Sequence, residues 1–347
     1  CSAIIITSGT FLKGKIHIGP KSFPAGRFGE KPAKGLTECL ENHGFESGRL
    51  KTGTPPRILS SSVDWSLCEK SLGDLEPNPF SIDTPRPFNP KNIPCYVSYT
   101  NQNSHNLIQE NIMTSAMFSG KISAIGPRYC PSIEDKISRF SDRDRHQLFL
   151  EPEWLDSDQI YINGFSTSLS EKIQTSALHK IKGLENCKLI RPGYAIEYDY
   201  FPSRQLKSTL ETKNINGLFL AGQINGTSGY EEAAAQGLIS GINAAAYILK
   251  SSPLVLKRTE SYIGVLIDDL ITKHINEPYR MFTSSAEHRL YLRPDNVYTR
   301  LAKYAFKLNL YSPLRSKAIT NMLKEESLIK QKISNRSRKR IKHPNRS

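Results

Sequence analysis

The hydrophobic positions of this chain fall into short runs that are separated by polar and glycine-containing segments. Residues 3–7 and 218–221 are apolar runs of the length that buried strands have, and glycine follows each run, at Gly9 and at Gly222. Stretches with helical periodicity or mostly small residues predict helices at 36–43, 168–181 and 233–246. Strands that alternate with helices, with glycine at the turns, predict a doubly wound α/β domain that binds its ligands at the carboxyl ends of the strands.

The loop after the second run carries the strongest local signal. Three glycines fall within eight positions there, namely Gly222, Gly226 and Gly229. This density suits a backbone that passes close to a ligand, because glycine has no Cβ. Thr227 or Ser228 can cap the following helix, and Glu231 lies in its first turn. The loop predicts a site for an anionic or electron-rich group at a helix N-terminus, and the alternative is a closely packed crossover without a ligand.

Charge and length change this interpretation only in part. The net charge is +14, and residues 332–346 supply seven basic and no acidic residues, a run that predicts a disordered, solvated tail. The rest of the chain carries a net charge of +7, which favours a polyanionic partner only weakly. No apolar run approaches the length of a membrane span. The chain starts without methionine inside a predicted strand, so we expect that residue 1 is not the start of the protein.

Cys130 is the clearest candidate for a reactive side chain. Arg128 stands two residues before it and Lys136 six residues after it, and nearby cations favour the nucleophilic thiolate. The alternative is that Cys130 is a small buried hydrophobic residue. The six cysteines contain no CxxC pair, and no spacing of histidine, aspartate and glutamate indicates a metal site. His17 is better explained as a packed or solvent-facing residue than as a base.

Six further strings extend the picture along the chain. They are Thr10-Phe-Leu-Lys-Gly-Lys-Ile-His-Ile-Gly19, Gly48-Arg-Leu-Lys-Thr-Gly-Thr-Pro-Pro-Arg57, Gly126-Pro-Arg-Tyr-Cys-Pro-Ser-Ile-Glu-Asp-Lys136, Arg191-Pro-Gly-Tyr-Ala-Ile-Glu-Tyr-Asp199, Gly264-Val-Leu-Ile-Asp-Asp269 and Glu277-Pro-Tyr-Arg-Met-Phe-Thr283. With the glycine loop, they resemble the MnmG/GidA family over residues 3–301. These are FAD-dependent enzymes that modify the wobble uridine of tRNA. The order of the strings matches the family order, which chance matches of short motifs do not explain.

The resemblance implies an FAD site built from both glycine turns. Its residues would be Gly9, Gly222, Gln223, Asn225, Thr227, Gly229, Tyr230 and Glu231. Gln223 matches a glutamine that contacts flavin in the family, and its amide can hydrogen-bond the isoalloxazine edge. The alternative is that Gln223 only ties down the loop, and that Glu231 only interacts with the helix dipole.

The resemblance also implies roles for the segment around Cys130. Cys130 matches an essential cysteine, proposed to add to C6 of uracil so that C5 becomes nucleophilic, or to act as an acid or base in that step. A nicotinamide cofactor, NADH, would contact Gly126, Arg128, Tyr129, Lys136, Arg139 and Phe140. A helix start at Pro131-Ser132 fits this role. The cations could equally bind RNA phosphate or form a solvated basic face.

Three basic residues flank the rigid string Thr52-Gly-Thr-Pro-Pro56. Arg49, Lys51 and Arg57 could approach flavin or RNA phosphate, and we predict RNA contacts for them; a plain surface turn is the alternative. Two departures from the family put RNA affinity in doubt. Ser285 replaces an arginine, and Trp154 stands where glycine is typical.

The resemblance implies a domain order with an incomplete FAD/NAD(P)-binding Rossmann-like domain, an inserted α+β domain and the start of a C-terminal helical domain. We expect the second part of the FAD-binding domain in 1–50, an inserted substrate- and NAD-binding domain in 51–205, and the return segment in 206–250. A helical region would occupy 251–330, before the basic tail 331–347. No G-x-G-x-x-G follows a strand, so the chain resembles a central fragment.

The implied reaction uses FAD, NADH and methylene-tetrahydrofolate to install a carboxymethylaminomethyl or taurinomethyl group at C5 of U34. The implied partners are tRNA, an MnmE-type GTPase and a second copy of the chain, with no membrane. The expected location is mitochondrial, with the bacterial cytoplasm as the alternative. Two other functions stay open, namely a basic fragment that binds RNA or a partner without flavin, and folate-dependent C5-methylation of tRNA uridine.

Overall fold

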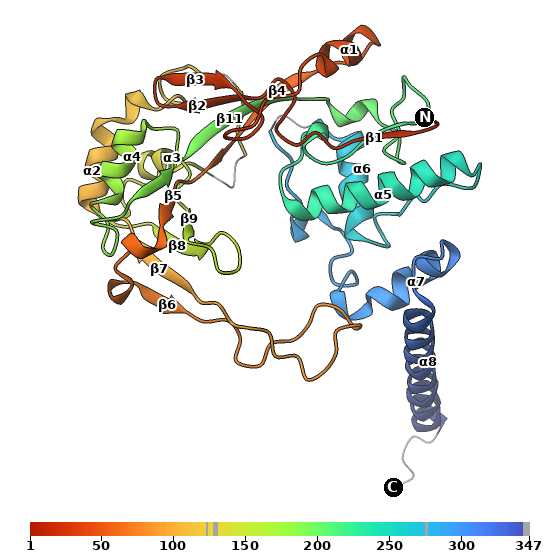
Figure 1. Cartoon of the computed structure of the whole chain (residues 1–347). Coiled ribbons are helices and arrows are strands. Elements are labelled where there is room, and N and C mark those ends of the chain that lie inside the picture. The colour runs from red at the N-terminus through yellow and green to blue at the C-terminus, as the bar shows by residue number, and fades with distance from the viewer. Residues whose placement is uncertain (123, 128–130, 275–276, 343–347) are drawn as a thin grey trace. The chain divides into compact units, whose positions relative to one another are not determined.

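The computed structural model describes residues 1–122, 124–127, 131–274 and 277–342, and its contacts divide the chain into two compact units (Figure 1). The first unit contains both glycine turns and both larger sheets. Its segments are Cys1–Pro79, Arg86–Leu254 and Asp269–Arg280. The second unit is helical and consists of Phe80–Pro85, Val255–Asp268 and the chain from Met281 onward.

The two apolar runs form a pair of parallel strands in the first unit. Strand β1 (Ile4–Ile6) pairs with β12 (Leu218–Leu220), with Ile4 opposite Leu218. Helix α5 (Tyr230–Ile248) follows β12 and packs against both strands. The three helices predicted at 36–43, 168–181 and 233–246 are confirmed, as α1 (Leu36–Asn42), α4 (Glu171–Leu178) and α5.

A four-stranded antiparallel sheet lies next along the chain, in the order β3-β2-β11-β4. Its strands are β2 (Lys15–Ile18), β3 (Lys21–Pro24), β4 (Gly48–Thr54) and β11 (Tyr194–Tyr200). Alternate residues give the sheet one apolar face, with Ile16 and Ile196, and one charged face, with Glu197 and Asp199. Strand β4 crosses the predicted domain boundary at residue 51, so this sheet contains strands from both predicted domains.

Strand β11 is anchored at both ends. At its start, the Gly193 amide donates to Oε1 of Gln174 in α4 (2.7 Å), and at its end the Phe201 amide donates to the Ile224 carbonyl in the glycine loop (2.7 Å). All seven residues of β11 are in register with β4, from Tyr194 opposite Thr54 to Tyr200 opposite Gly48. The strand therefore connects α4, in the part of the chain between β4 and β11, to the loop after β12. This part of the chain is called the inserted part below.

The inserted part is a six-stranded antiparallel sheet, in the order β10-β5-β9-β8-β7-β6. Its strands are β5 (Arg57–Leu59), β6 (Glu69–Ser71), β7 (Cys95–Tyr99), β8 (Gln147–Pro152), β9 (Gln159–Asn163) and β10 (Leu189–Arg191). Helices α2 (Gln102–Glu110), α3 (Ile133–Arg139) and α4 contribute to the buried core that lies on one face of this sheet. Leu148, Leu150 and Ile160 point into that core, so their neighbours in sequence point away from it.

The second unit contains most of α6 (Tyr262–Thr272), together with α7 (Val297–Lys307) and α8 (Pro313–Lys342). Arg258 binds Asp268 (3.0 Å) and Glu287 (2.6 Å) within this unit. Helix α8 continues to Lys342, so the prediction of a disordered tail from residue 331 is wrong as far as Lys342. The reason is that 314–342 contain neither proline nor glycine, and that lysine and arginine are good helix formers.

Two buried histidines of the inserted part predict a pH dependence of stability. Burial lowers the pKa of His146 to about 4 and also lowers the pKa of His105, whose ring centroid lies 5.3 Å away. The folded state keeps His146 neutral, whereas the unfolded chain binds a proton near pH 6.5. Stability is therefore complete above pH 6.5 and falls as the pH drops toward 4, by up to ~1.4 kcal/mol per pH unit. Urea unfolding of the protein and of His146→Phe at pH 7 and pH 4.5 tests this, because phenylalanine does not titrate; an equal loss in both proteins would contradict it.

Candidate functional site

Gln236, from the second turn of α5, holds the glycine loop from inside. Its Oε1 accepts hydrogen bonds from the Gly222 amide (3.2 Å) and from Nδ2 of Asn225 (2.8 Å). Its Nε2 donates to Oγ1 of Thr227 (3.0 Å), and this hydroxyl donates to the Gly222 carbonyl (3.0 Å). Asn225 and Thr227 are buried, so in this structure their side chains shape the loop. Sequence reasoning missed Gln236, because a glutamine in a helix of small residues gives no local signal.

The two glycine turns meet at the carboxyl ends of β1 and β12. A Cβ atom at Gly9 would lie 3.6 Å from Oε1 of Gln223. Both Gly9 and Gly222 have positive φ (54° and 89°), which favours glycine at these positions. Gln223 also hydrogen-bonds the hydroxyl of Tyr198, whose pKa burial raises to about 12. The prediction that both turns share one edge of the sheet is thus confirmed.

A distant segment closes the loop at the start of α5. The Ser228 amide donates to the Tyr279 carbonyl, and the Tyr279 amide donates to the Gly226 carbonyl, both at 2.8 Å. Arg280 forms ion pairs with Glu231 and Glu232, each at 3.5 Å. A side chain at Gly229 would collide with the Arg280 guanidinium. Glu231 is thus paired as well as placed in the first turn, whereas the ring of Tyr230 is 93% exposed.

A cavity of about 340 Å³ gathers residues for which the sequence predicted separate roles. Lys51, predicted to contact RNA, lines it together with Gly126 and Arg139, predicted to contact NADH. Lys51 is only 6% exposed, and its side chain packs directly against Gly126, where a Cβ would overlap it. Glu277 also lines the cavity, two residues before Tyr279, whose backbone closes the glycine loop.

The cavity borders the segment of the predicted nucleophile. Pro127 and Pro131 both line it, and they are the nearest described residues on either side of 128–130. The predicted Arg128, Tyr129 and Cys130 lie outside the described residues.

The helix predicted after Pro131 is present as α3. Ser132 caps it in a capping box with Asp135. Glu134 lies in the first turn and is buried, where it accepts a hydrogen bond from the Ser168 amide (2.9 Å) and burial raises its pKa. Lys136 donates from Nζ to the Gly164 carbonyl (2.9 Å), which is not in the cavity lining, and Phe140 is partly exposed at the helix end. The structure thus brings Arg139, but neither Lys136 nor Phe140, to the cavity.

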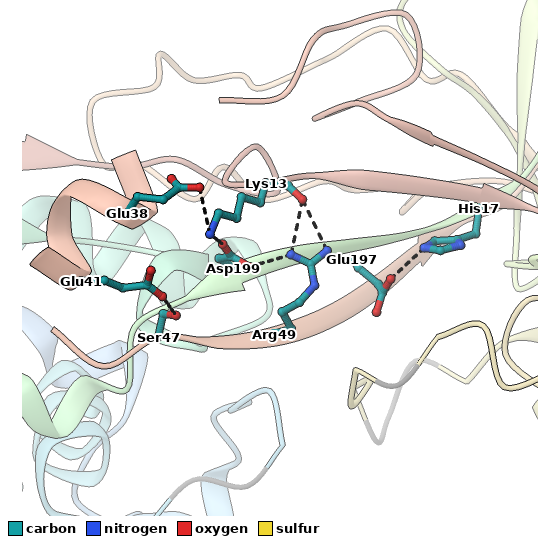
Figure 2. Close-up of polar contacts among 8 residues, drawn as sticks. All are labelled: Lys13, His17, Glu38, Glu41, Ser47, Arg49, Glu197 and Asp199. Atoms are coloured by element: carbon teal, nitrogen blue, oxygen red, sulfur yellow. Dashed lines mark hydrogen bonds and ion pairs between the residues drawn. The ribbon is translucent and has the colours of Figure 1, made fainter. Parts of the chain in front are cut away.

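The other two predicted RNA contacts are held by partners within the protein. Figure 2 shows Arg49 next to Asp199, with a bond of 2.6 Å, and Lys13 bridging to Glu38 (3.0 Å). Arg57 binds Glu153 (3.0 Å) and lies over the ring of Tyr161 (4.7 Å). Their role toward RNA stays a prediction.

His17 lies on the charged face of the same sheet and is fully buried. Its Nε2 is 2.8 Å from Oε2 of Glu197, and its Nδ1 is 2.8 Å from the Ser22 hydroxyl (Figure 2 shows the pair with Glu197). Burial lowers the pKa of His17. The packed alternative for His17 is therefore the correct one.

Among the described residues, no three histidine, cysteine, aspartate or glutamate side chains lie together as a metal site would need. None of the helices in the described ranges is both long and apolar enough to cross a membrane. Five cysteines within these ranges are free thiols, and burial raises the pKa of Cys187 to about 12.

The parallel strand pair, the glycine loop and the helix behind it define an α/β protein with a Rossmann-like nucleotide-binding domain, which confirms the predicted fold class. The family model described as "GIDA: Glucose inhibited division protein A" matches residues 1–252. The chain belongs to the GidA family.

Solved structures and curated relatives agree with this assignment. Two crystal forms of Aquifex aeolicus GidA match with TM-scores of 0.88 and 0.87, at 49% and 47% identity, over 95% of this chain and 56% and 53% of theirs. A relative from Campylobacter fetus subsp. fetus is 56% identical over 93% of this chain and 52% of its own length. A relative from Flavobacterium johnsoniae is 55% identical over the same shares. Both are named tRNA uridine 5-carboxymethylaminomethyl modification enzyme MnmG, and the chain spans about half of their length.

Proposed function

We propose that the protein is an FAD-dependent enzyme that installs a carboxymethylaminomethyl group at C5 of the wobble uridine U34 in tRNA. The observation that carries the proposal is that one compact unit contains two features: the glycine edge where Gly9 approaches Gln223, and the cavity lined by Pro127 and Pro131. The segment 277–280 connects them, because it lines the cavity at one end and pairs with the glycine loop at the other.

The residues present fit a flavin. Gly9 and Gly222 leave bare backbone at one edge, the amide of Gln223 faces that edge, and α5 starts beside it. Bound FAD would supply the redox chemistry and carry the one-carbon unit. Gln223 would hydrogen-bond the isoalloxazine, and the loop of Asn225, Thr227, Gly229, Tyr230 and Glu231 would surround it. NADH as reductant and methylene-tetrahydrofolate as carbon donor complete the proposed reaction.

The protein's own residues would prepare the uracil in the cavity. Cys130, as thiolate, would add to C6, which raises the electron density at C5. Lys51 and Arg139 supply positive charge in the cavity wall, where it would hold the thiolate, a phosphate or NADH. The uridine must leave the anticodon stack to enter.

Lys51 gives a test of this arrangement that does not need the full reaction. We expect Lys51→Met to slow alkylation of Cys130 by iodoacetamide at pH 7, because loss of a nearby cation raises the thiol pKa; one pKa unit corresponds to ~10-fold. Peptide mass spectrometry follows each cysteine, and exposed Cys39 is the internal control. Lys51→Arg should retain most of the wild-type rate. Equal rates at Cys130 in Lys51→Met and in the wild type would contradict the role of Lys51.

The proposed partners are tRNA, an MnmE-type GTPase and a second copy of the chain. The amine donor, glycine or taurine, decides between the carboxymethylaminomethyl and the taurinomethyl product. We propose a mitochondrial location, with the bacterial cytoplasm as the alternative; the relatives named above come from bacteria, which supports the alternative.

One reaction distinguishes the proposal from its competitors. The protein is incubated with FAD, NADH, methylene-tetrahydrofolate, the GTPase with GTP, glycine and unmodified tRNA, and nucleosides are analysed by mass spectrometry. A 5-carboxymethylaminomethyl group on U34 supports the proposal. A 5-methyluridine product indicates folate-dependent methylation instead, and a colourless protein that binds tRNA without any product indicates the non-enzymatic alternative.

A further inference from the structure

The six-stranded sheet has an outer face that the core does not use. Leu148 and Leu150 of β8 and Ile160 and Ile162 of β9 all enter the core. Because side chains alternate along a strand, the residues between them point to the opposite face. Phe149, between the two leucines, is 36% exposed on that face.

Three aromatic residues form a diagonal row across this face, on neighbouring strands (Figure 1 shows β7, β8 and β9). The register places Glu151 of β8 opposite Tyr161 of β9, and Val97 of β7 opposite Phe149. In the same register, Tyr99 is opposite Gln147. Tyr161, Phe149 and Tyr99 are therefore diagonal neighbours, and such neighbours lie about 7–8 Å apart.

Arginines cover the two ends of the row. The guanidinium carbon of Arg57 lies 4.7 Å from the ring centroid of Tyr161, and that of Arg145 lies 4.4 Å from the ring centroid of Tyr99. Arg57 is bound to Glu153, whereas Arg145 lies on an exposed turn before β8. Phe149, in the middle of the row, is partly exposed to solvent.

We propose that this face binds single-stranded RNA by stacking, with a base on Phe149 and with the guanidinium group of Arg145 stacking on a flanking base or holding a phosphate. Unpaired bases stack on aromatic rings and on guanidinium planes, and an open sheet with aromatic residues on neighbouring strands is a platform for such bases. Outside the tail 332–346 the chain carries a net charge of +7, which weakly favours a polyanion, and Arg145 adds an exposed cation at one end of the row. The inference rests on the proposed function, which makes the single-stranded anticodon loop of tRNA the RNA to be bound.

The test compares Phe149→Ala with Phe28→Ala. Both phenylalanines are 36% exposed, and Phe28 lies outside the row, against Tyr194. Fluorescence anisotropy measures the Kd of a labelled RNA hairpin with an anticodon loop and of a fully paired RNA duplex. We expect Phe149→Ala, and equally Phe149→Leu, to weaken hairpin binding ~10-fold or more and to leave duplex binding unchanged. We expect Phe28→Ala to stay within ~2-fold of wild type, and Arg145→Gln to reduce the salt slope by ~0.7.

The outcomes separate this inference from the proposed function. Wild-type hairpin affinity in Phe149→Ala and Phe149→Leu, or an equal loss in Phe28→Ala, overturns the stacking platform. Either result leaves the modification reaction untouched, since that is judged by nucleoside analysis. If the wild-type protein forms no modification product, but Phe149→Ala and Phe149→Leu still bind the hairpin more weakly than the wild type, the proposed function is overturned and the stacking platform stands. Melting temperatures equal to wild type exclude unfolding as the cause.

Discussion

Replacing Cys130 by serine is expected to abolish modification of the wobble uridine, by at least ~1,000-fold, while flavin content stays near that of the wild type. The serine hydroxyl is a far weaker nucleophile than a thiolate near cations, so addition to C6 would stop. Flavin content should persist, because the glycine edge is built from Gly9 and the loop after β12, not from the segment that borders the cavity. Nucleoside analysis of reacted tRNA and the absorbance of purified protein measure the two effects.

Cys39→Ser is the matched control for this change, because Cys39 is an exposed thiol in α1. It should modify tRNA at the wild-type rate. Normal C5 modification by Cys130→Ser would remove Cys130 from the mechanism, and a parallel loss of flavin would show that the segment is structural.

Gly222→Val is the second change for which we expect a large effect, namely loss of FAD. Gly222 has φ 89° and ψ −142°, a conformation that a β-branched residue strongly resists. Relief of this strain would move the backbone that carries the Gln236 hydrogen bond and the neighbouring Gln223. The flavin-to-protein ratio from the visible spectrum, together with circular dichroism, measures whether cofactor or fold is lost.

The control for this variant is Gly241→Ala in α5, the helix that follows the glycine loop. Gly241 has open space where a Cβ would stand, and alanine in a helix interior is more stable than glycine by about 1 kcal/mol. Gly241→Ala should therefore keep its flavin and unfold at a slightly higher urea concentration. If Gly222→Val retains a full complement of flavin, the loop after β12 is only structural.

The parts of the fold that the sequence predicted are those with a local cause. The strands β1 and β12 are unbroken apolar runs, and α5 follows glycines and carries glutamates in its first turn, so each could be recognised within its own residues. The tail prediction failed for a local reason too, since charge density was weighed above the absence of helix breakers in α8.

The site was less predictable because its contacts join distant parts of the chain. Arg280 reaches Glu231 from 49 positions away, and Lys51 meets Gly126 from 75 positions away. Neither partner signals the other in sequence, because isolated parallel bridges, Thr227 with Tyr279 and Leu50 with Ile125, bring these distant segments together. The family resemblance identified both lysines as candidate site residues. It gave no information on side-chain direction, and in the structure Lys136 donates to the Gly164 carbonyl whereas Lys51 lines the cavity.

Strand β11 joins the inserted part of the first unit to the glycine loop after β12 through one hydrogen-bonded strand. Seven paired residues span about 23 Å at the usual rise per residue, and a paired strand cannot change its length to absorb a displacement. Gln174 of α4 and Ile224, the residue after Gln223 at the glycine edge, are therefore bonded to the two ends of one paired strand. With RNA and flavin bound as proposed above, β11 would link the RNA-binding sheet to the edge at Gln223, and the arrival of substrate would be felt at the cofactor without direct contact.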